Sequence, residues 1–159
     1  MIIYFFLNGK KVSVNSPPNK IVLDILREEF QIHSIRRNCD GKMCGSCLIL
    51  LNNSPVYSCK LPVFEIKDKE VWTMEGISSQ KDFQDILEGF AQTSIRLCSK
   101  CAPARALSIE GMLRQTHSAD AEIISETVKL VNCECGPARR IEEAILKIFN
   151  AREKRLHGK

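Results

Sequence analysis

The eight cysteines of this 159-residue chain fall into two separate groups of four. The first group occupies the run CDGKMCGSC and one position further on, and it comprises Cys39, Cys44, Cys47 and Cys59. The second group occupies the runs CSKC and CEC, and it comprises Cys98, Cys101, Cys133 and Cys135. Four thiolates are a complete ligand set for one metal site, so two such sites would use every cysteine in the chain. This complete use favours metal binding over isolated core cysteines.

The spacing within the first group is specific. C-x4-C-x2-C with a fourth cysteine further on is the plant-type [2Fe–2S] pattern. Gly41, Gly45 and Ser46 lie among the first three ligands, so the loop has little side-chain bulk and can wrap a cluster. Its backbone N–H groups can then donate to the sulfur atoms, which stabilises negative charge and helps to set the reduction potential. We therefore expect a [2Fe–2S] cluster at the first group.

Other uses of the cysteines must be weighed. A disulfide framework requires an oxidising compartment. The N-terminal run MIIYFFLNGKK has too short an apolar stretch for a signal peptide and no basic region before it, which favours a cytoplasmic location. Structural zinc is the stronger rival, because four-cysteine zinc sites often use C-x2-C pairs. Taken by its spacing alone, the second group is compatible with either zinc or an iron–sulfur cluster.

The composition and the motifs argue against a membrane protein, a nucleic-acid binder and a hydrolytic enzyme. The hydrophobic content of 44% and the mean hydropathy of −0.13 are those of an ordinary soluble protein, and no stretch reaches the length of a membrane helix. The net charge of +4 is spread over both halves, so neither half has the basic concentration of a nucleic-acid binder. The chain contains no Ser/His/Asp set, phosphate loop or carboxylate pair at catalytic spacing. We expect no catalytic residues on this chain.

The first half has the pattern of a small mixed α+β unit over residues 1–76. Two apolar runs flank Asn8-Gly9, which is a strong hairpin signal. Apolar residues recur at helical spacing over residues 20–30, and the cysteine loop follows over about residues 36–47. Short strands are predicted at residues 48–51, 56–58 and 70–74.

The second half, residues 77–159, is predicted to be all helical, with helices over 80–92, 103–115, 119–131 and 137–155. The first helix places Phe83, Ile86, Leu87 and Phe90 on one face. Two cysteines of the second group precede the second helix, and the other two lie between the third and fourth helices. Antiparallel helices joined by short loops bring such ends together, so four thiolates from two loops can form one site.

Nearly the whole chain resembles the iron–sulfur subunit of the molybdenum hydroxylases, the family of xanthine dehydrogenase and aldehyde oxidoreductase. The matching motifs are CDGKMCGSC with Cys59, the C-x2-C-x-P run at 98–103 and the C-x-C at 133–135, together with Ile141 and Ala144. The resemblance implies an N-terminal β-grasp, plant-type ferredoxin-like domain followed by an all-α four-helix domain. It also implies a second [2Fe–2S] cluster, held by Cys98, Cys101, Cys133 and Cys135.

The resemblance implies a non-catalytic electron-transfer subunit with two [2Fe–2S] clusters. In such a complex a molybdopterin-binding catalytic subunit hydroxylates a heterocycle or an aldehyde with water. Electrons pass through the second cluster and then the first to an FAD-binding subunit, and on to NAD or another acceptor. We expect both partners on separate chains. The alternative is a free-standing two-cluster ferredoxin-like carrier, or an iron–sulfur regulatory module, without a molybdenum partner.

The chain departs from the family pattern around the second group. Leu97 stands where the family usually has a Gln that is associated with the pterin end of the molybdenum cofactor, and this departure supports the alternative. Glu134 stands where the family usually has an Arg. A carboxylate beside a cluster makes its surroundings more negative and is expected to lower its reduction potential.

Overall fold

The chain begins with the hairpin that its Asn-Gly pair predicts. Strand β1 (Ile2–Leu7) pairs antiparallel with β2 (Lys10–Asn15). The turn residues Asn8 and Gly9 have φ angles of 51° and 81°. Two successive positive φ angles are typical of a type I′ turn, whose twist matches that of the strands it joins.

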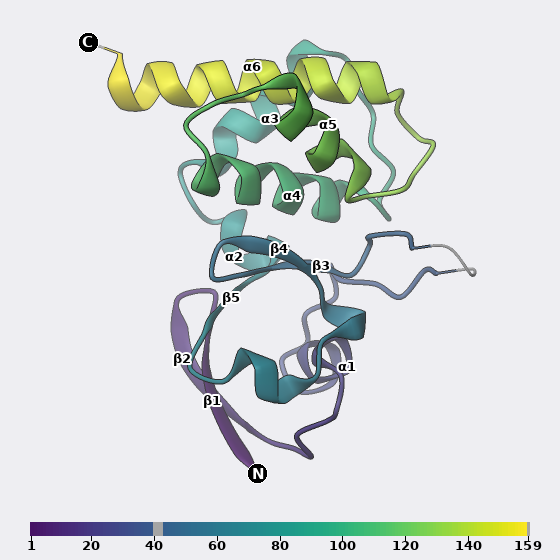
Figure 1. Cartoon of the computed structure of the whole chain (residues 1–159), viewed down its shortest axis with the longest axis vertical. Coiled ribbons are helices and arrows are strands. Elements are labelled where there is room, and N and C mark those ends of the chain that lie inside the picture. Colours follow the sequence, from purple (N-terminus) through teal and green to yellow (C-terminus); the bar gives the residue numbers. More distant parts are fainter. Residues whose placement is uncertain (40–42, 159) are drawn as a thin grey trace.

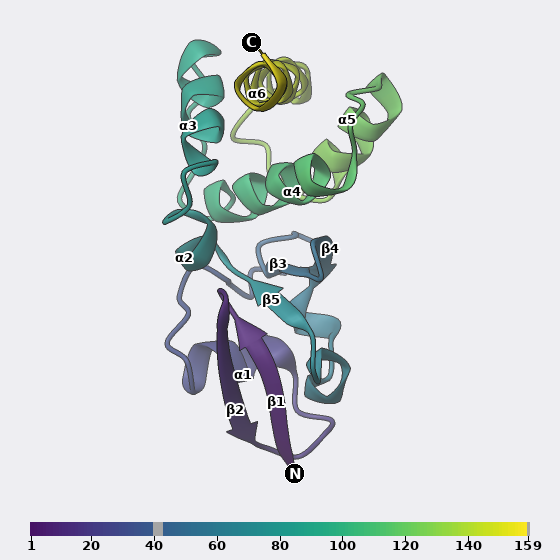
Figure 2. The same ribbon diagram turned by 90° about the vertical axis from the view of Figure 1, so that its left-hand side faces the viewer.

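The computed structural model describes residues 1–39 and 43–158, and Gly41 lies outside these ranges. Five strands form one mixed sheet in the order β2-β1-β5-β3-β4 (Figures 1 and 2). Strand β3 (Leu48–Leu51) runs antiparallel to both β4 (Ser54–Tyr57) and β5 (Glu70–Trp72), and β5 runs parallel to β1. Helix α1 (Val22–Glu28) packs on one face of this sheet, and 3₁₀ turns at Ser58–Lys60 and Val63–Ile66 follow β4. This arrangement agrees with the expected β-grasp, ferredoxin-like unit.

Alternation along β1 builds the core of the sheet unit. Ile3, Phe5 and Leu7 are buried, whereas the residues between them point to the opposite face and are exposed. The buried side chains meet the apolar face of α1, which consists of Val22, Leu23, Ile25 and Leu26. A strand of period two and a helix of period 3.6 therefore share one apolar layer.

The last strand is shorter than the sequence predicts. It ends at Trp72 rather than at residue 74, and the short helix α2 (Met74–Ile77) begins directly after it. Asn8 from the hairpin turn explains this ending: its Oδ1 accepts the backbone N–H of Thr73 at 2.9 Å, and its Nδ2 donates to Thr73 Oγ1 at 3.0 Å. A Cβ at Gly76 would lie 2.2 Å from Asn8 Oδ1, so the close approach requires glycine there.

All four helices predicted in the second half are present, with ends within three residues of the predicted bounds. They are α3 (Phe83–Gln92), α4 (Ala102–Gln115), α5 (Ala121–Lys129) and α6 (Ala138–His157). Helix α4 lies nearest the sheet and α6 lies farthest from it (Figure 2). Among the described residues, no helix combines the length and the apolar character needed to cross a bilayer.

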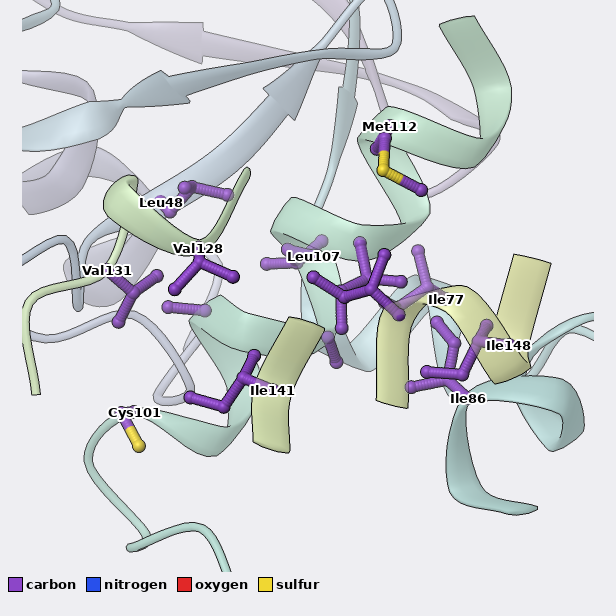
Figure 3. Packing of buried hydrophobic residues seen from close by; sticks show 14 of the residues in the cluster. Leu48, Ile77, Ile86, Cys101, Leu107, Met112, Val128, Val131, Ile141 and Ile148 are labelled. Atoms are coloured by element: carbon purple, nitrogen blue, oxygen red, sulfur yellow. The ribbon is translucent and has the colours of Figure 1, made fainter. Parts of the chain in front are cut away.

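Strand β3 joins the two halves, because its opposite faces belong to different cores. Ile49 packs with the sheet unit, whereas Leu48 and Leu50 pack with the helices. Figure 3 shows Leu48 in the helical core. Helix α4 comes close to the sheet at Gly111, where a Cβ would lie 2.8 Å from both Leu50 Cδ2 and Pro55 Cγ. The helical half therefore rests directly on the sheet half.

One predicted core position is wrong. Leu87 was expected on the buried face of the first helix, but 48% of it is exposed. The buried face of α3 instead includes Asp85, Ile86 and Gly89. Asp85 accepts hydrogen bonds from Arg152 at 2.8 Å and from Arg155, and Gly89 lets Ile148 of α6 approach closely. The buried face of α3 therefore carries an ion-paired carboxylate and a glycine in place of Leu87.

Candidate iron–sulfur sites

The second cysteine group forms one compact cluster of sulfur atoms. The Sγ atoms of Cys98, Cys101, Cys133 and Cys135 all lie within 4.8 Å of one another. The shortest separations are 3.1 Å between Cys101 and Cys135 and 3.4 Å between Cys98 and Cys101. The helical half thus brings together all four residues that the sequence assigned to this group.

Two helix N-termini position these ligands. Cys101 is the N-terminal cap residue of α4, and the backbone N–H groups of Cys101 and Ala102 donate to the Cys98 carbonyl oxygen at 3.2 and 3.0 Å. Cys133 and Cys135 lie in the loop between α5 and α6. Figure 3 shows the Cys101 side chain at the margin of the apolar core, on the side of Ile141 of α6. Both helix starts favour negative charge at this place.

The first cysteine group lies as two close pairs of sulfur atoms. The Sγ atoms of Cys39 and Cys44 are 3.4 Å apart, and those of Cys47 and Cys59 are 3.2 Å apart. Cys39, Cys47 and Cys59 line one hollow of about 210 Å³. The backbone N–H of Ser46 donates to Cys44 Sγ at 3.5 Å, as expected for a loop that surrounds a cluster with N–H groups.

The two cysteine groups are connected by contacts that the sequence did not reveal. Gly45 has a φ angle of 77°, and a Cβ at this residue would lie 2.3 Å from the Leu130 carbonyl oxygen. That same carbonyl accepts the Tyr57 hydroxyl at 2.9 Å. The backbone N–H of Asn132 donates to the Cys44 carbonyl oxygen at 3.0 Å. The loop of the first group therefore rests against the segment that leads into Cys133.

The chemistry of the donor set fits a metal cluster. None of the eight cysteines is paired in a disulfide. Burial raises the pKa of Cys47 to about 12 and also raises that of Cys101, and a bound cation would offset the cost of ionising these thiols. Burial opposes ionisation of Cys98 as well, but hydrogen bonding with Cys101 outweighs it and lowers the pKa of Cys98 to about 6. Soft thiolates in sets of four suit iron–sulfur clusters or zinc.

The two departures near the second group lie in different settings. Leu97 is half-buried and packs against the apolar core of the helices. Glu134 is exposed between Cys133 and Cys135.

Trp72, at the end of β5, is partly buried beneath the guanidinium of Arg114, which lies 5.0 Å from the centroid of its ring. The indole therefore packs between the two halves.

Comparison with known proteins indicates the type of centre at the first cysteine group. Residues 5–72 match the family described as the 2Fe-2S iron-sulfur cluster binding domain. The nicotinate dehydrogenase small FeS subunit of Eubacterium barkeri is 27% identical over 139 residues, which are 87% of this chain and 88% of that subunit. Aldehyde oxidase 3 of Rattus norvegicus is 30% identical over 152 residues, which are 88% of this chain but 11% of that much longer protein.

The fold also resembles that of a chain in a solved oxidoreductase structure. Quinoline 2-oxidoreductase from Pseudomonas putida 86 contains a chain that superimposes with a TM-score of 0.83 at 23% identity, over 100% of this chain and 98% of that one. The match extends over both the sheet half and the helical half, which confirms the predicted fold class. Nearly the whole chain is therefore similar to the small iron–sulfur subunits of the molybdenum hydroxylases, which supports its role as an electron-transfer iron–sulfur subunit.

Proposed function

We propose that this subunit carries two [2Fe–2S] clusters, one for each group of four cysteines. The observation that best supports this assignment is the convergence of the second group, whose four Sγ atoms lie within 4.8 Å of one another. The proposed ligands of the first cluster are Cys39, Cys44, Cys47 and Cys59. The proposed ligands of the second are Cys98, Cys101, Cys133 and Cys135. When bound, each cluster supplies a centre that gains and loses one electron.

The chain's own part in the reaction is to hold the two centres close together and to tune them. The backbone N–H of Asn132 donates to the Cys44 carbonyl oxygen. This hydrogen bond supports direct electron transfer between the two sites, because Cys44 belongs to one site and Cys133, which follows Asn132, belongs to the other. Tyr57 fixes the same junction by donating to Leu130.

The proposed partners are a molybdopterin-binding catalytic subunit and an FAD-binding subunit, both on separate chains. Electrons would enter at the second cluster and leave from the first. The full-length match to a subunit named as the small FeS subunit of a dehydrogenase supports such an assembly. A complex of this type hydroxylates a heterocycle or an aldehyde. We also propose a cytoplasmic location, because ligand thiols must stay reduced.

We propose a domain boundary between residues 76 and 77. Separate apolar cores in the two halves support it. Strand β3 contributes side chains to both cores, so a fragment of residues 1–76 would expose Leu48 and Leu50 to solvent. The two domains are therefore expected to be stable together and less stable apart.

Electron paramagnetic resonance of paired variants tests the assignment of ligands. In the anaerobically purified and reduced chain, Cys44→Ser should abolish one [2Fe–2S] signal and leave the other. Cys133→Ser should do the reverse. Wild-type protein with a single signal, or loss of both signals in either folded variant, would show that the cysteines are not divided between two sites as proposed.

A further inference from the structure

Arg105 is a buried cation beside the second cysteine group. It lies on α4, one turn after Cys101, and its backbone N–H donates to the Cys101 carbonyl oxygen at 2.8 Å. Only 3% of Arg105 is exposed. Arg105 and Cys133 line the same hollow of about 470 Å³, which Met43 of the first cysteine loop also borders.

Protein groups satisfy the Arg105 guanidinium poorly. One terminal nitrogen donates to the Val128 carbonyl oxygen, while the buried Nε has no hydrogen-bond partner among the residues that the structure describes. Within residues 1–39 and 43–158, no carboxylate forms an ion pair with Arg105. The equally buried Arg152 differs, because Asp85 and Glu110 pair with it at 2.8 and 3.0 Å. A buried cation with one neutral partner is costly unless another anion lies near.

The sulfur ligands of the second group are anions beside Arg105, which lines a hollow with Cys133 and follows Cys101 by one helical turn. Burial lowers the pKa of Arg105, and the negative charges of Cys101, Cys135 and Cys133 oppose that effect. Arginine remains charged under any such shift, because its ordinary pKa is so high. A cluster held by four thiolates is itself an anion, and it gains a further negative charge on reduction. A cluster would therefore supply the compensation that the guanidinium lacks.

We propose that Arg105 is the counter-charge of the second cluster and raises its reduction potential. This inference rests on the proposed function, specifically on the assignment of the second group to a [2Fe–2S] cluster. A fixed positive charge in a poorly solvated place stabilises the more negative, reduced state more than the oxidised state. The exposed Glu134 opposes this effect only weakly, because water and salt screen its charge. Arg105 thus makes the second cluster a readier electron acceptor.

A redox titration followed by electron paramagnetic resonance tests the role of Arg105 in the full chain. Arg105→Met removes the charge and keeps an unbranched apolar stem, whereas Arg105→Gln removes the charge but can still donate to Val128. Both should shift the second cluster towards the oxidised state by about tenfold, which is about 59 mV for one electron. The first cluster should move much less. Arg105→Lys should retain most of the wild-type potential.

Lys100 provides the matched control, because it lies between ligands Cys98 and Cys101 but is exposed. Lys100→Met should move the potential far less than Arg105→Met. Loss of the second cluster in both neutral variants, with retention in Arg105→Lys, would also support the role of the charge. An unchanged potential in Arg105→Met, equal shifts of both clusters, or equal loss of the cluster in all three variants would overturn it.

The same spectra separate this inference from the proposed function. If the second [2Fe–2S] signal is present but its reduction potential is the same in wild type and in the Arg105 variants, only the role of Arg105 as counter-charge is refuted. A wild-type chain without a second [2Fe–2S] signal would refute the assignment of the cluster and the role of Arg105 together.

Discussion

The backbone N–H of Asn132 donates a 3.0 Å hydrogen bond to the carbonyl oxygen of Cys44. This bond joins a proposed ligand of the first cluster to the residue that precedes a proposed ligand of the second. It crosses the junction between the sheet half and the helical half at the place where the two sites approach each other. Tyr57 and Gly45 add further contacts there, both at Leu130.

The junction predicts a sharp contrast between two glycines that each follow a cysteine ligand. Gly45→Ala should destabilise the first site, because residue 45 has a positive φ angle and its Cβ would lie 2.3 Å from a carbonyl oxygen. We expect a cost of about 1–3 kcal/mol or more and partial loss of the first [2Fe–2S] signal. Gly136→Ala is the control, since its Cβ would meet ordinary contacts at 3.5 Å or beyond. Equal behaviour of the two variants in iron content and thermal unfolding would contradict this account of the junction.

The buried ion cluster predicts a large effect on stability. Arg152→Met would remove the cation that the buried Asp85 and Glu110 share, while Arg155 and Arg114 still pair with them, and we expect a loss of about 1–3 kcal/mol in the free energy of unfolding. Arg155 pairs with Asp85 from a partly exposed position, so Arg155→Met should cost about 1 kcal/mol or less. Denaturant unfolding followed by circular dichroism measures both. A loss at Arg152 no larger than that at Arg155 would show that this network does not anchor α6.

The charge beside the second cluster predicts a shift in its potential. Glu134→Arg replaces an exposed carboxylate between two ligands by a cation, so the potential of the second cluster should rise while that of the first moves much less. Because Glu134 is exposed, the shift should be small and should shrink as the salt concentration is raised. A redox titration at two ionic strengths checks both statements. A shift confined to the first cluster would mean that Cys133 and Cys135 hold a different site from the one proposed.

Local patterns in the sequence predicted most of the elements. The Asn8-Gly9 pair predicted the first hairpin, and helical periodicity predicted all four helices of the second half. These signals lie between neighbours in the chain, so a single sequence displays them. The grouping of the second four cysteines also followed, because helix ends and short loops limit where those ligands can lie.

Contacts between residues far apart in the chain could not be predicted from the sequence. The contacts of Asn8 with Thr73 end β5 and begin α2, and they join residues 65 positions apart. The burial of Asp85 in place of Leu87 depends on arginines of α6 that no local pattern links to α3. In the sequence, Arg105 is one of several polar residues in a predicted helix. Its burial beside the sulfur ligands appears only once α4 and α5 are packed.

Metal and sulfide analysis of the anaerobically purified chain tests the central claim most directly. Two [2Fe–2S] clusters require two irons and two inorganic sulfides for each group of four cysteines, with no zinc in stoichiometric amount. The account predicts this composition at both groups, together with two distinct resonance signals after reduction. Zinc stoichiometric with either group, and iron sufficient for only one cluster, would contradict it.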